Sequence, residues 1–111
     1  MKNYLRYLLN ANKVSVDYDD TASTAKGKEL LKRLISEGKS VYIISARSSK
    51  FPIVNALKDL IPEGNIYATG SNKAKVEKAN SLNIGTHYDN RQDVVDDMNK
   101  MGIKGILFNG R

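Results

Sequence analysis

Acidic side chains cluster near the start of the chain, where Asp17, Asp19 and Asp20 follow the apolar run Val14–Val16. Two carboxylates held close together repel each other unless a cation sits between them, and Mg²⁺ prefers such hard oxygen ligands. In this Asp-x-Asp-x-Thr pattern one carboxylate could attack phosphorus, while the other protonates the leaving oxygen and later activates water. The simpler alternative is a solvated acidic turn in which Thr21 begins a helix.

A second polar segment, Ser45-Ala46-Arg47, follows the apolar run Val41–Ile44. A hydroxyl and exposed N–H groups between a strand and a helix can bind phosphate oxygens. The Arg47 guanidinium could add a bidentate contact to the same phosphate. The alternative is an ordinary turn, in which serine is common.

Lysines near position 73 form the third candidate element, in the segment Ser71-Asn72-Lys73-Ala74-Lys75. A lysine at the start of a helix is unfavourable for the helix dipole, so its presence there suggests an anion nearby. We predict that Lys73, rather than Lys75, faces the phosphate. The alternative is a solvent-exposed lysine.

The fourth element is Asp89-Asn90-Arg91-Gln92-Asp93, which follows the short predicted strand Thr86-His87-Tyr88. Asp89 could bind a metal ion, and Asp93 could support the metal or Lys73 from the next helix. Asp89 or Asn90 could instead cap that helix. His87 lies two residues before Asp89, on the same face of a strand, and we expect it to pack or hydrogen-bond rather than to catalyse.

Short apolar runs alternate with helical periodicity along the whole chain. Strands are predicted at 13–16, 40–44, 65–68, 86–88 and 105–108, with helices beginning near Ser23 or Thr24, Pro52, Ser71 and Val94. Strands alternating with helices indicate an α/β fold with a parallel sheet. Ligands of such sheets bind at the carboxyl ends of the strands, which is where all four candidate elements fall.

The composition is that of one globular domain spanning 1–111, with 41% hydrophobic and 27% charged residues and no cysteine. We expect a cytoplasmic protein without a membrane segment, because no long apolar run is present. A formal net charge of +6 favours anionic partners, or else serves solubility. Residues 1–12 are predicted to form an N-terminal arm or helix, which could join two copies into a homo-oligomer.

The order of these four elements resembles that of the haloacid dehalogenase-like (HAD) phosphatases over residues 13–108. The resemblance implies a single Rossmann-like, three-layer domain with five parallel strands in the order 3-2-1-4-5. It also implies Mg²⁺ as cofactor, with Asp17, Asp19 and Asp89 as ligands, Asp19 contributing its backbone carbonyl. Asp17 would be the nucleophile and Asp19 the general acid and base. Residues that bind the phosphoryl group or support the site would be Ser45, Ala46, Arg47, Lys73, Asp93, Asn90 and Thr21.

The segments Ser45–Arg47 and Asp89–Val95 look like those of the 3′-phosphatase domain of phage-type polynucleotide kinases, although Asn90 replaces an acid. That likeness implies a nucleotide or nucleic-acid end as substrate. Asp20 stands where many HAD-like proteins have glycine, and no insertion is long enough for a cap domain.

Three alternatives remain open or can be weighed from the sequence. The chain could hydrolyse a small phosphorylated metabolite, or it could be an inactive HAD-like binding module. A phosphorylated receiver domain would carry its aspartate after the third strand, where this sequence reads Ala68-Thr69-Gly70. The absence of an acid there argues against a receiver.

Overall fold

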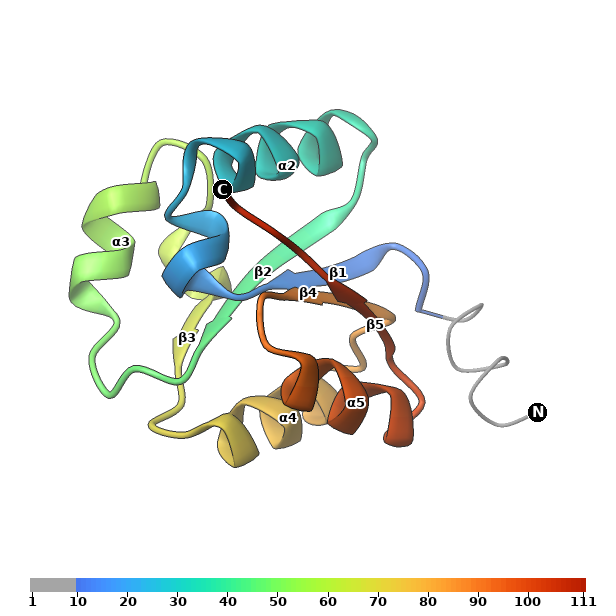
Figure 1. Ribbon diagram of the computed structural model, residues 1–111. Coiled ribbons are helices and arrows are strands. Elements are labelled where there is room, and N and C mark those ends of the chain that lie inside the picture. The colour runs from blue at the N-terminus through green and yellow to red at the C-terminus, as the bar shows by residue number, and fades with distance from the viewer. Residues whose placement is uncertain (1–9) are drawn as a thin grey trace.

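The structure is a computed structural model that describes residues 10–111 of the chain. It contains one sheet of five parallel strands in the order β3-β2-β1-β4-β5, which confirms the predicted fold class (Figure 1). The strands are β1 (Lys13–Val16), β2 (Ser40–Ser45), β3 (Ile66–Ala68), β4 (Thr86–Asp89) and β5 (Lys104–Leu107). The predicted N-terminal arm falls largely on residues 1–9, outside the described residues.

Helices cover both faces of the sheet and give three layers (Figure 1). On one face lie α2 (Ala25–Ser36) and α3 (Phe51–Leu57), and on the other lie α4 (Asn72–Ser81) and α5 (Gln92–Lys100). Two short turns complete the chain, η1 (Tyr18–Ala22) after β1 and η2 (Glu63–Asn65) before β3. Within residues 10–111 no inserted cap domain interrupts this order, as expected from the sequence.

The two faces of the sheet have separate hydrophobic cores because successive strand residues point to opposite sides. In β2, Ile43 packs with the core under α2 and α3, whereas Ile44 packs with the core under α4 and α5. Both side chains are fully buried. This alternation also sends the polar residues of the central strands to defined faces, which decides what each can contact.

Hydroxyl side chains cap two of the helices where the sequence indicated. Thr24, rather than Ser23, accepts a hydrogen bond from Gly27 N (2.9 Å) at the start of α2. Ser71 accepts from Ala74 N (3.0 Å) at the start of α4. These caps satisfy backbone N–H groups that have no partner inside the helix.

Some element details differ from the prediction. Helix α3 ends at Leu57, and its buried residues are Ile53 and Leu57. The last strand begins one residue earlier, at Lys104.

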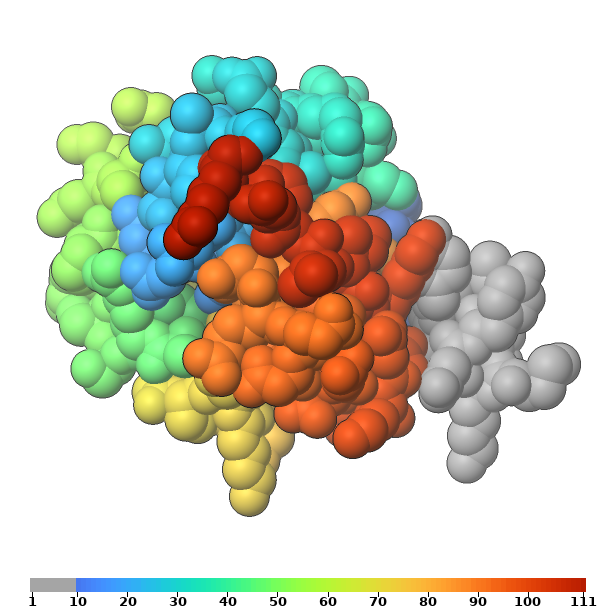
Figure 2. Space-filling view, viewed as in Figure 1, coloured from blue at the N-terminus to red at the C-terminus, as the bar shows by residue number. Residues whose placement is uncertain are grey.

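No described helix is long and apolar enough to cross a membrane. The C-terminal residues run from β5 across the front of η1 and the start of α2 (Figure 2), where Gly110 packs close to Asp20 and Thr24.

Candidate active site

Two carboxylates meet at the carboxyl ends of neighbouring central strands. Asp17 directly follows β1, and Asp89 is the last residue of β4. The strands pair in parallel with Val16 opposite Tyr88, and Asp17 N donates to Tyr88 O (2.9 Å). Both aspartates are buried, although they are 72 positions apart in sequence. The strand register therefore brings the predicted first and fourth elements together.

Lys75 bridges these two carboxylates. Its Nζ lies 2.7 Å from Asp17 Oδ1 and 3.0 Å from Asp89 Oδ2, and only 2% of the residue is exposed. The prediction that Lys73 faces the site was wrong. Lys73 lines a surface groove between α4 and α5 instead. The two lysines are separated by roughly 200° around the helix, so both cannot face the sheet.

Asp17 occupies an environment that disfavours its charge. Burial raises the pKa of the Asp17 carboxyl, and the neighbouring Asp89 charge raises it further, although the Lys75 ammonium opposes both effects. The second oxygen of Asp17, Oδ2, accepts a hydrogen bond from the buried Thr21 hydroxyl (3.2 Å). The predicted supporting residue Thr21 thus contacts the proposed nucleophile directly.

Asp89 is held by donors on several sides. Its Oδ2 contacts both Lys75 Nζ and His87 Nε2 (2.8 Å), and its Oδ1 accepts from Arg91 N (3.1 Å). Burial disfavours the charged form, but the hydrogen bonds and charges of His87 and Lys75 outweigh it, so the pKa of Asp89 lies below its usual range. Of the two aspartates, Asp89 is therefore the one whose surroundings favour the charged form.

The turn η1 carries Asp19 and Asp20 to the edge of the site. Asp20 has a φ of +59°, a left-handed conformation that glycine adopts most easily and aspartate tolerates. The turn closes on β1 through the bond from Ala22 N to Asp17 O (3.0 Å).

Asp19 lines the site cavity, but its carboxylate pairs with Arg47. Arg47 Nη2 lies 2.7 Å from Asp19 Oδ1, and Arg47 Nε lies 2.9 Å from Asp19 Oδ2. The guanidinium also lies 5.2 Å from the centre of the Tyr18 ring. The Arg47 guanidinium is thus engaged in an ion pair whose members are both about half exposed, and its phosphate contact stays a prediction.

Ala46 shares a cavity with Asp17, whereas Ser45 is not among the residues that line it. The Ser45 side chain is buried, and its Oγ accepts a hydrogen bond from Arg47 N (3.0 Å), so the hydroxyl hydrogen is free to be donated elsewhere. Ala46 lines the cavity above Asp17. The loop thus brings Ala46 to the cavity, while the Ser45 hydroxyl lies buried behind it in a hydrogen bond with Arg47 N.

Asp93 does not support the site as predicted. Arg91 Nε and Nη2 bind its two oxygens (3.0 and 2.9 Å), and Val94 N donates to Asp93 Oδ1 (3.0 Å). The Arg91 bond keeps the pKa of Asp93 below its ordinary value. The side chain is mostly exposed at the start of α5 and contacts neither Lys73 nor Lys75. Asn90, in contrast, does line the site cavity, together with Arg91.

A cavity of about 290 Å³ opens above the carboxylate pair. The sequence interpretation did not identify two of its lining residues, Asn72 and Arg91, and it ranked Lys75 second. The other lining residues are Asp17, Asp19, Asp20, Ala46 and Asn90. Within residues 10–111, no three His, Cys, Asp or Glu side chains form a group that could hold a metal ion. The carboxylates of Asp17, Asp19 and Asp89 therefore do not converge, because Asp19 turns toward Arg47.

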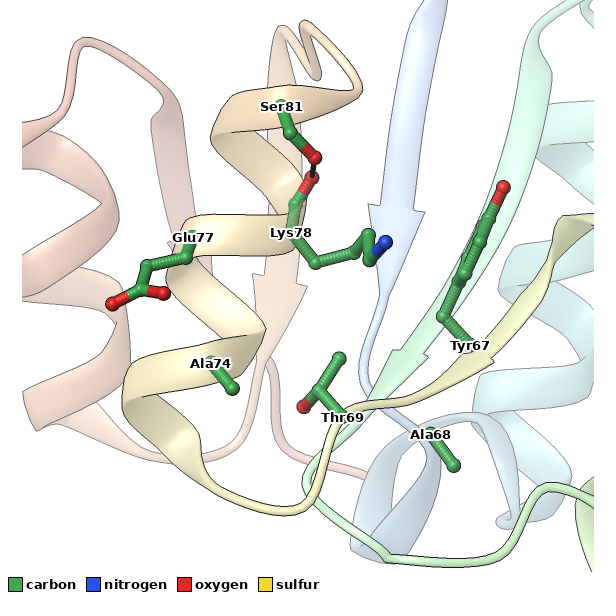
Figure 3. Close-up of a pocket in the computed structure, with 7 residues that line it drawn as sticks. All are labelled: Tyr67, Ala68, Thr69, Ala74, Glu77, Lys78 and Ser81. Carbon is green, nitrogen blue, oxygen red and sulfur yellow. Dashed lines mark hydrogen bonds between the residues drawn. The ribbon is translucent and has the colours of Figure 1, made fainter.

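A second groove, of about 510 Å³, lies between the edge strand β3 and α4 (Figure 3). The Lys78 side chain extends from α4 toward Tyr67, with its Nζ 5.0 Å from the ring centre. Ala74 and Thr69 line the end of the groove nearer the start of α4 (Figure 3). Helix α4 thus contributes to both spaces, through Ala74 and Lys78 here and through Asn72 and Lys75 at the site cavity.

Comparison with known proteins supports the fold alone. No protein-family model matches this chain. No curated protein sequence matches it either. Its structure is similar to the crystal structure of an uncharacterized protein from Corynebacterium glutamicum, with a TM-score of 0.66 and 16% sequence identity. The match covers 86% of this chain and 83% of the other, so the α/β architecture is shared across nearly the whole length of both.

Proposed function

We propose that this protein is a magnesium-dependent phosphomonoester hydrolase of the HAD type in which Asp17 is the nucleophile. The observation that carries the proposal is the contact of the buried Lys75 ammonium with both Asp17 and Asp89 beneath an open cavity. A carboxylate at the end of a central strand, partly neutralised by a lysine, suits attack on a phosphoryl group. The sequence order of the four polar elements supports the same interpretation.

In the first step an Asp17 oxygen forms a bond to phosphorus as the bond from phosphorus to the leaving oxygen breaks. Asp19 supplies the proton that the leaving alkoxide needs, which gives the free alcohol and an aspartyl-phosphate. Lys75 offsets negative charge at Asp17, which would otherwise repel the phosphoryl oxygens. Ser45 and the backbone N–H groups of its loop are the donors proposed for those oxygens.

In the second step a water oxygen attacks the phosphorus of the aspartyl-phosphate. Asp19, now ionised, accepts a proton from that water, and the bond between phosphorus and the Asp17 oxygen breaks. Inorganic phosphate is released and the Asp17 carboxylate is restored. Asp19 must leave its ion pair with Arg47 to act in either step, and the half-exposed setting of that pair allows the movement.

Mg²⁺ is the proposed cofactor, although among residues 10–111 no three acidic or histidine side chains group around one point, so backbone and water ligands must complete its shell. Asp17, Asp89 and Lys75 carry an excess of one negative charge in a buried setting, and a cation would compensate for it. The carboxylates of Asp17 and Asp89 and the backbone carbonyl of Asp19 would hold the ion. So few protein ligands are normal for Mg²⁺, which keeps several waters and binds substrate phosphate. When bound, the ion would neutralise charge that develops on the phosphoryl oxygens.

The proposed substrate is a nucleotide or a nucleic-acid end. The chain has a formal net charge of +6, which attracts polyanions, and the groove along α4, the helix that carries Lys75, offers the Tyr67 ring and the Lys78 ammonium. An aromatic face with a nearby cation suits a base and its flanking phosphate. With no cap domain among residues 10–111, the cavity is open to a large substrate.

The test is a phosphatase screen with Mg²⁺ over nucleotides, 3′-phosphorylated oligonucleotides and sugar phosphates, with Asp17→Asn as the inactive control. We expect oligonucleotides or nucleotides to be hydrolysed and the variant to release no phosphate. Lys78→Gln should raise KM for oligonucleotides without changing turnover of a small chromogenic phosphate, and Lys73→Gln is its matched control. Equal inactivity of wild type and Asp17→Asn on every substrate would refute the proposed phosphatase activity. Turnover of sugar phosphates alone would refute a nucleotide or nucleic-acid end as the substrate.

A further inference from the structure

His87 is the chain's single histidine and lies fully buried in β4. It stands directly opposite Ser15 in the parallel pairing of β1 with β4. Strand alternation directs both side chains toward the face covered by α4 and α5, away from the apolar residues Val14 and Val16. A polar pair buried between strands is costly unless its hydrogen bonds are satisfied, so its presence calls for an explanation.

Both ring nitrogens of His87 have a partner. Nε2 lies 2.8 Å from Asp89 Oδ2, and Nδ1 lies 2.6 Å from Ser15 Oγ. The Asp89 carboxylate, which also contacts the Lys75 ammonium, is an acceptor, so Nε2 carries the hydrogen and donates it. Nδ1 of the neutral ring then accepts from the Ser15 hydroxyl. Each side chain thereby fixes the orientation of the next, from Ser15 through His87 to Asp89.

We infer that His87 and Ser15 are positioning residues that hold Asp89 in the orientation required to bind Mg²⁺. The inference rests on the proposed function, in which Asp89 is a metal ligand. Without the imidazole, Oδ2 of Asp89 would keep only the Lys75 contact, and Lys75 is shared with Asp17. The carboxylate could then turn toward Lys75, away from the metal. Residues that orient a metal ligand typically contribute about 10- to 100-fold in metal affinity.

The first experiment reads the tautomer and does not depend on catalysis. Because the chain has one histidine, its ¹⁵N NMR signals need no assignment. We expect a hydrogen on Nε2 only, with Nδ1 as an acceptor, at neutral pH and without metal. In Ser15→Ala the Asp89 carboxylate still accepts from Nε2, so we expect the same tautomer with a shifted Nδ1 signal, because Nδ1 has lost its hydrogen bond. A hydrogen on Nδ1 in the wild type, or a Ser15→Ala spectrum identical to it, would overturn the positioning pair.

The second experiment measures Mg²⁺ binding by calorimetry in the wild type, His87→Leu, His87→Gln and Ile84→Ala. We expect His87→Leu to weaken binding about 10- to 100-fold, and His87→Gln, which keeps an N–H donor, to recover part of that loss. Ile84 is equally buried in the core on the same face, so Ile84→Ala should lower the melting temperature but leave Mg²⁺ affinity unchanged.

These outcomes separate the inference from the proposed function. Equal Mg²⁺ affinity in wild type and His87→Leu would overturn the positioning role while leaving the phosphatase proposal intact. An equal loss of affinity in Ile84→Ala would also overturn it, since the effect would then be general destabilisation. A wild-type chain that binds no Mg²⁺ would refute the magnesium site itself and with it the role of His87, whatever the tautomer.

Discussion

Lys75 Nζ lies 2.7 Å from Asp17 Oδ1, inside the protein and on the side of α4 that faces the sheet. Lys75 makes this contact with Asp17, whereas Lys73 on the same helix lines a surface groove elsewhere. We expect Lys75→Met to lower kcat by about 10²- to 10³-fold, as the loss of one donor that stabilises phosphoryl charge typically does. Lys73→Met, on the other side of the helix, should leave kcat close to that of the wild type. Initial-rate kinetics on the best substrate of the screen would decide between the two lysines.

Lys75→Met should also affect folding, because it leaves two buried carboxylates without their common cation. Removing one partner of a buried ion pair typically costs about 3–5 kcal/mol. We expect a marked fall in the denaturant midpoint for Lys75→Met and none for Lys73→Met. Equal midpoints in wild type and both variants would contradict the buried geometry described for Lys75.

Asp17→Asn should change how stability depends on pH in the absence of metal. Burial raises the pKa of folded Asp17 above its unfolded value of 3.8, so the folded state binds the proton more tightly. The resulting stabilisation is present at low pH and is lost as pH rises through the folded pKa. The amide of the variant does not titrate, so the variant does not lose this stabilisation. We therefore expect the free energy of unfolding of Asp17→Asn to increase relative to that of wild type as pH rises through the folded pKa of Asp17.

The measurement is urea unfolding of wild type and Asp17→Asn at several pH values from below 3.8 to neutral, with Asp59→Asn as the control. Asp59 is exposed on the surface, away from the site. Its variant should track wild type at every pH. A difference between wild type and Asp17→Asn that stays constant with pH would contradict the raised pKa.

Asp89 should give the opposite pH dependence, since its pKa is lowered in the folded protein by His87 and Lys75 in spite of burial. The stability it contributes is present above the unfolded pKa and is lost as pH falls through the folded one. We therefore expect Asp89→Asn to be less stable than wild type at neutral pH, and this deficit to shrink in strong acid. Acid titrations of both chains, followed by circular dichroism, would measure the deficit.

The ion pair between Asp19 and Arg47 should matter for turnover but little for folding. Exposed pairs typically contribute about 0–1 kcal/mol, so Arg47→Lys should unfold close to wild type. The bidentate hydrogen bonding of Arg47 to Asp19 would be lost, however, and we expect kcat or KM to change by several-fold. Arg33→Lys, in an exposed ion pair with Glu37 on α2, is the matched control and should change neither.

Asp19→Asn tests the role of that residue directly. Without the general base, attack of water on the aspartyl-phosphate should slow, so the phosphorylated protein should accumulate when substrate is added. Intact-protein mass spectrometry after an acid quench would detect the added phosphoryl group. Its absence from Asp19→Asn, with normal phosphate release, would exclude Asp19 as the acid and base.

Gly27 offers a test of the turn that carries Asp19. A Cβ at this position would lie 1.7 Å from Thr21 O and 2.8 Å from Ala22 Cα, so α2 and η1 would have to separate. Gly to Ala in a helix normally stabilises by about 0.5–1 kcal/mol. We expect Gly27→Ala instead to destabilise by about 1–3 kcal/mol or more, as overpacking does, and to lower activity by moving Asp19.

Gly64→Ala is the control for that substitution, because nothing lies within 4 Å of the added Cβ and the residue has no positive φ. We expect its thermal unfolding and activity to remain close to wild type. Thermal unfolding of Gly27→Ala at or above the wild-type temperature would show that η1 does not pack on α2 as described.

Much of the architecture was accessible from the sequence because its signals are local. Apolar runs alternating with helical periodicity predicted the parallel sheet, and the end of each run placed Asp17 and Asp89 at the same edge. The hydroxyl of Thr24 at a helix start and Pro52 in the first turn of α3 also acted as expected. Each of these features depends on neighbours within a few residues along the chain.

The orientation of side chains around the site was not accessible in this way. Lys73 and Lys75 have the same chemistry, and only the packing of Val76 and Ala79 against the sheet rotates α4 so that Lys75 faces Asp17. Arg47 was predicted to bind the substrate phosphate, but in the structure its guanidinium forms an ion pair with Asp19. Likewise Asp93 pairs with Arg91 rather than with a lysine of the site.

By itself the sequence determined the order of strands and helices and the acids that end the central strands, because hydrophobic periodicity and strand polarity act over short stretches. Only the tertiary structure decided that Lys75 and the buried His87 contact the carboxylates of the site and that Arg47 pairs with Asp19. Those choices depend on helix rotation, strand register and the distances between residues up to 72 positions apart, as for Ser15 and His87. Local sequence patterns do not encode such distances.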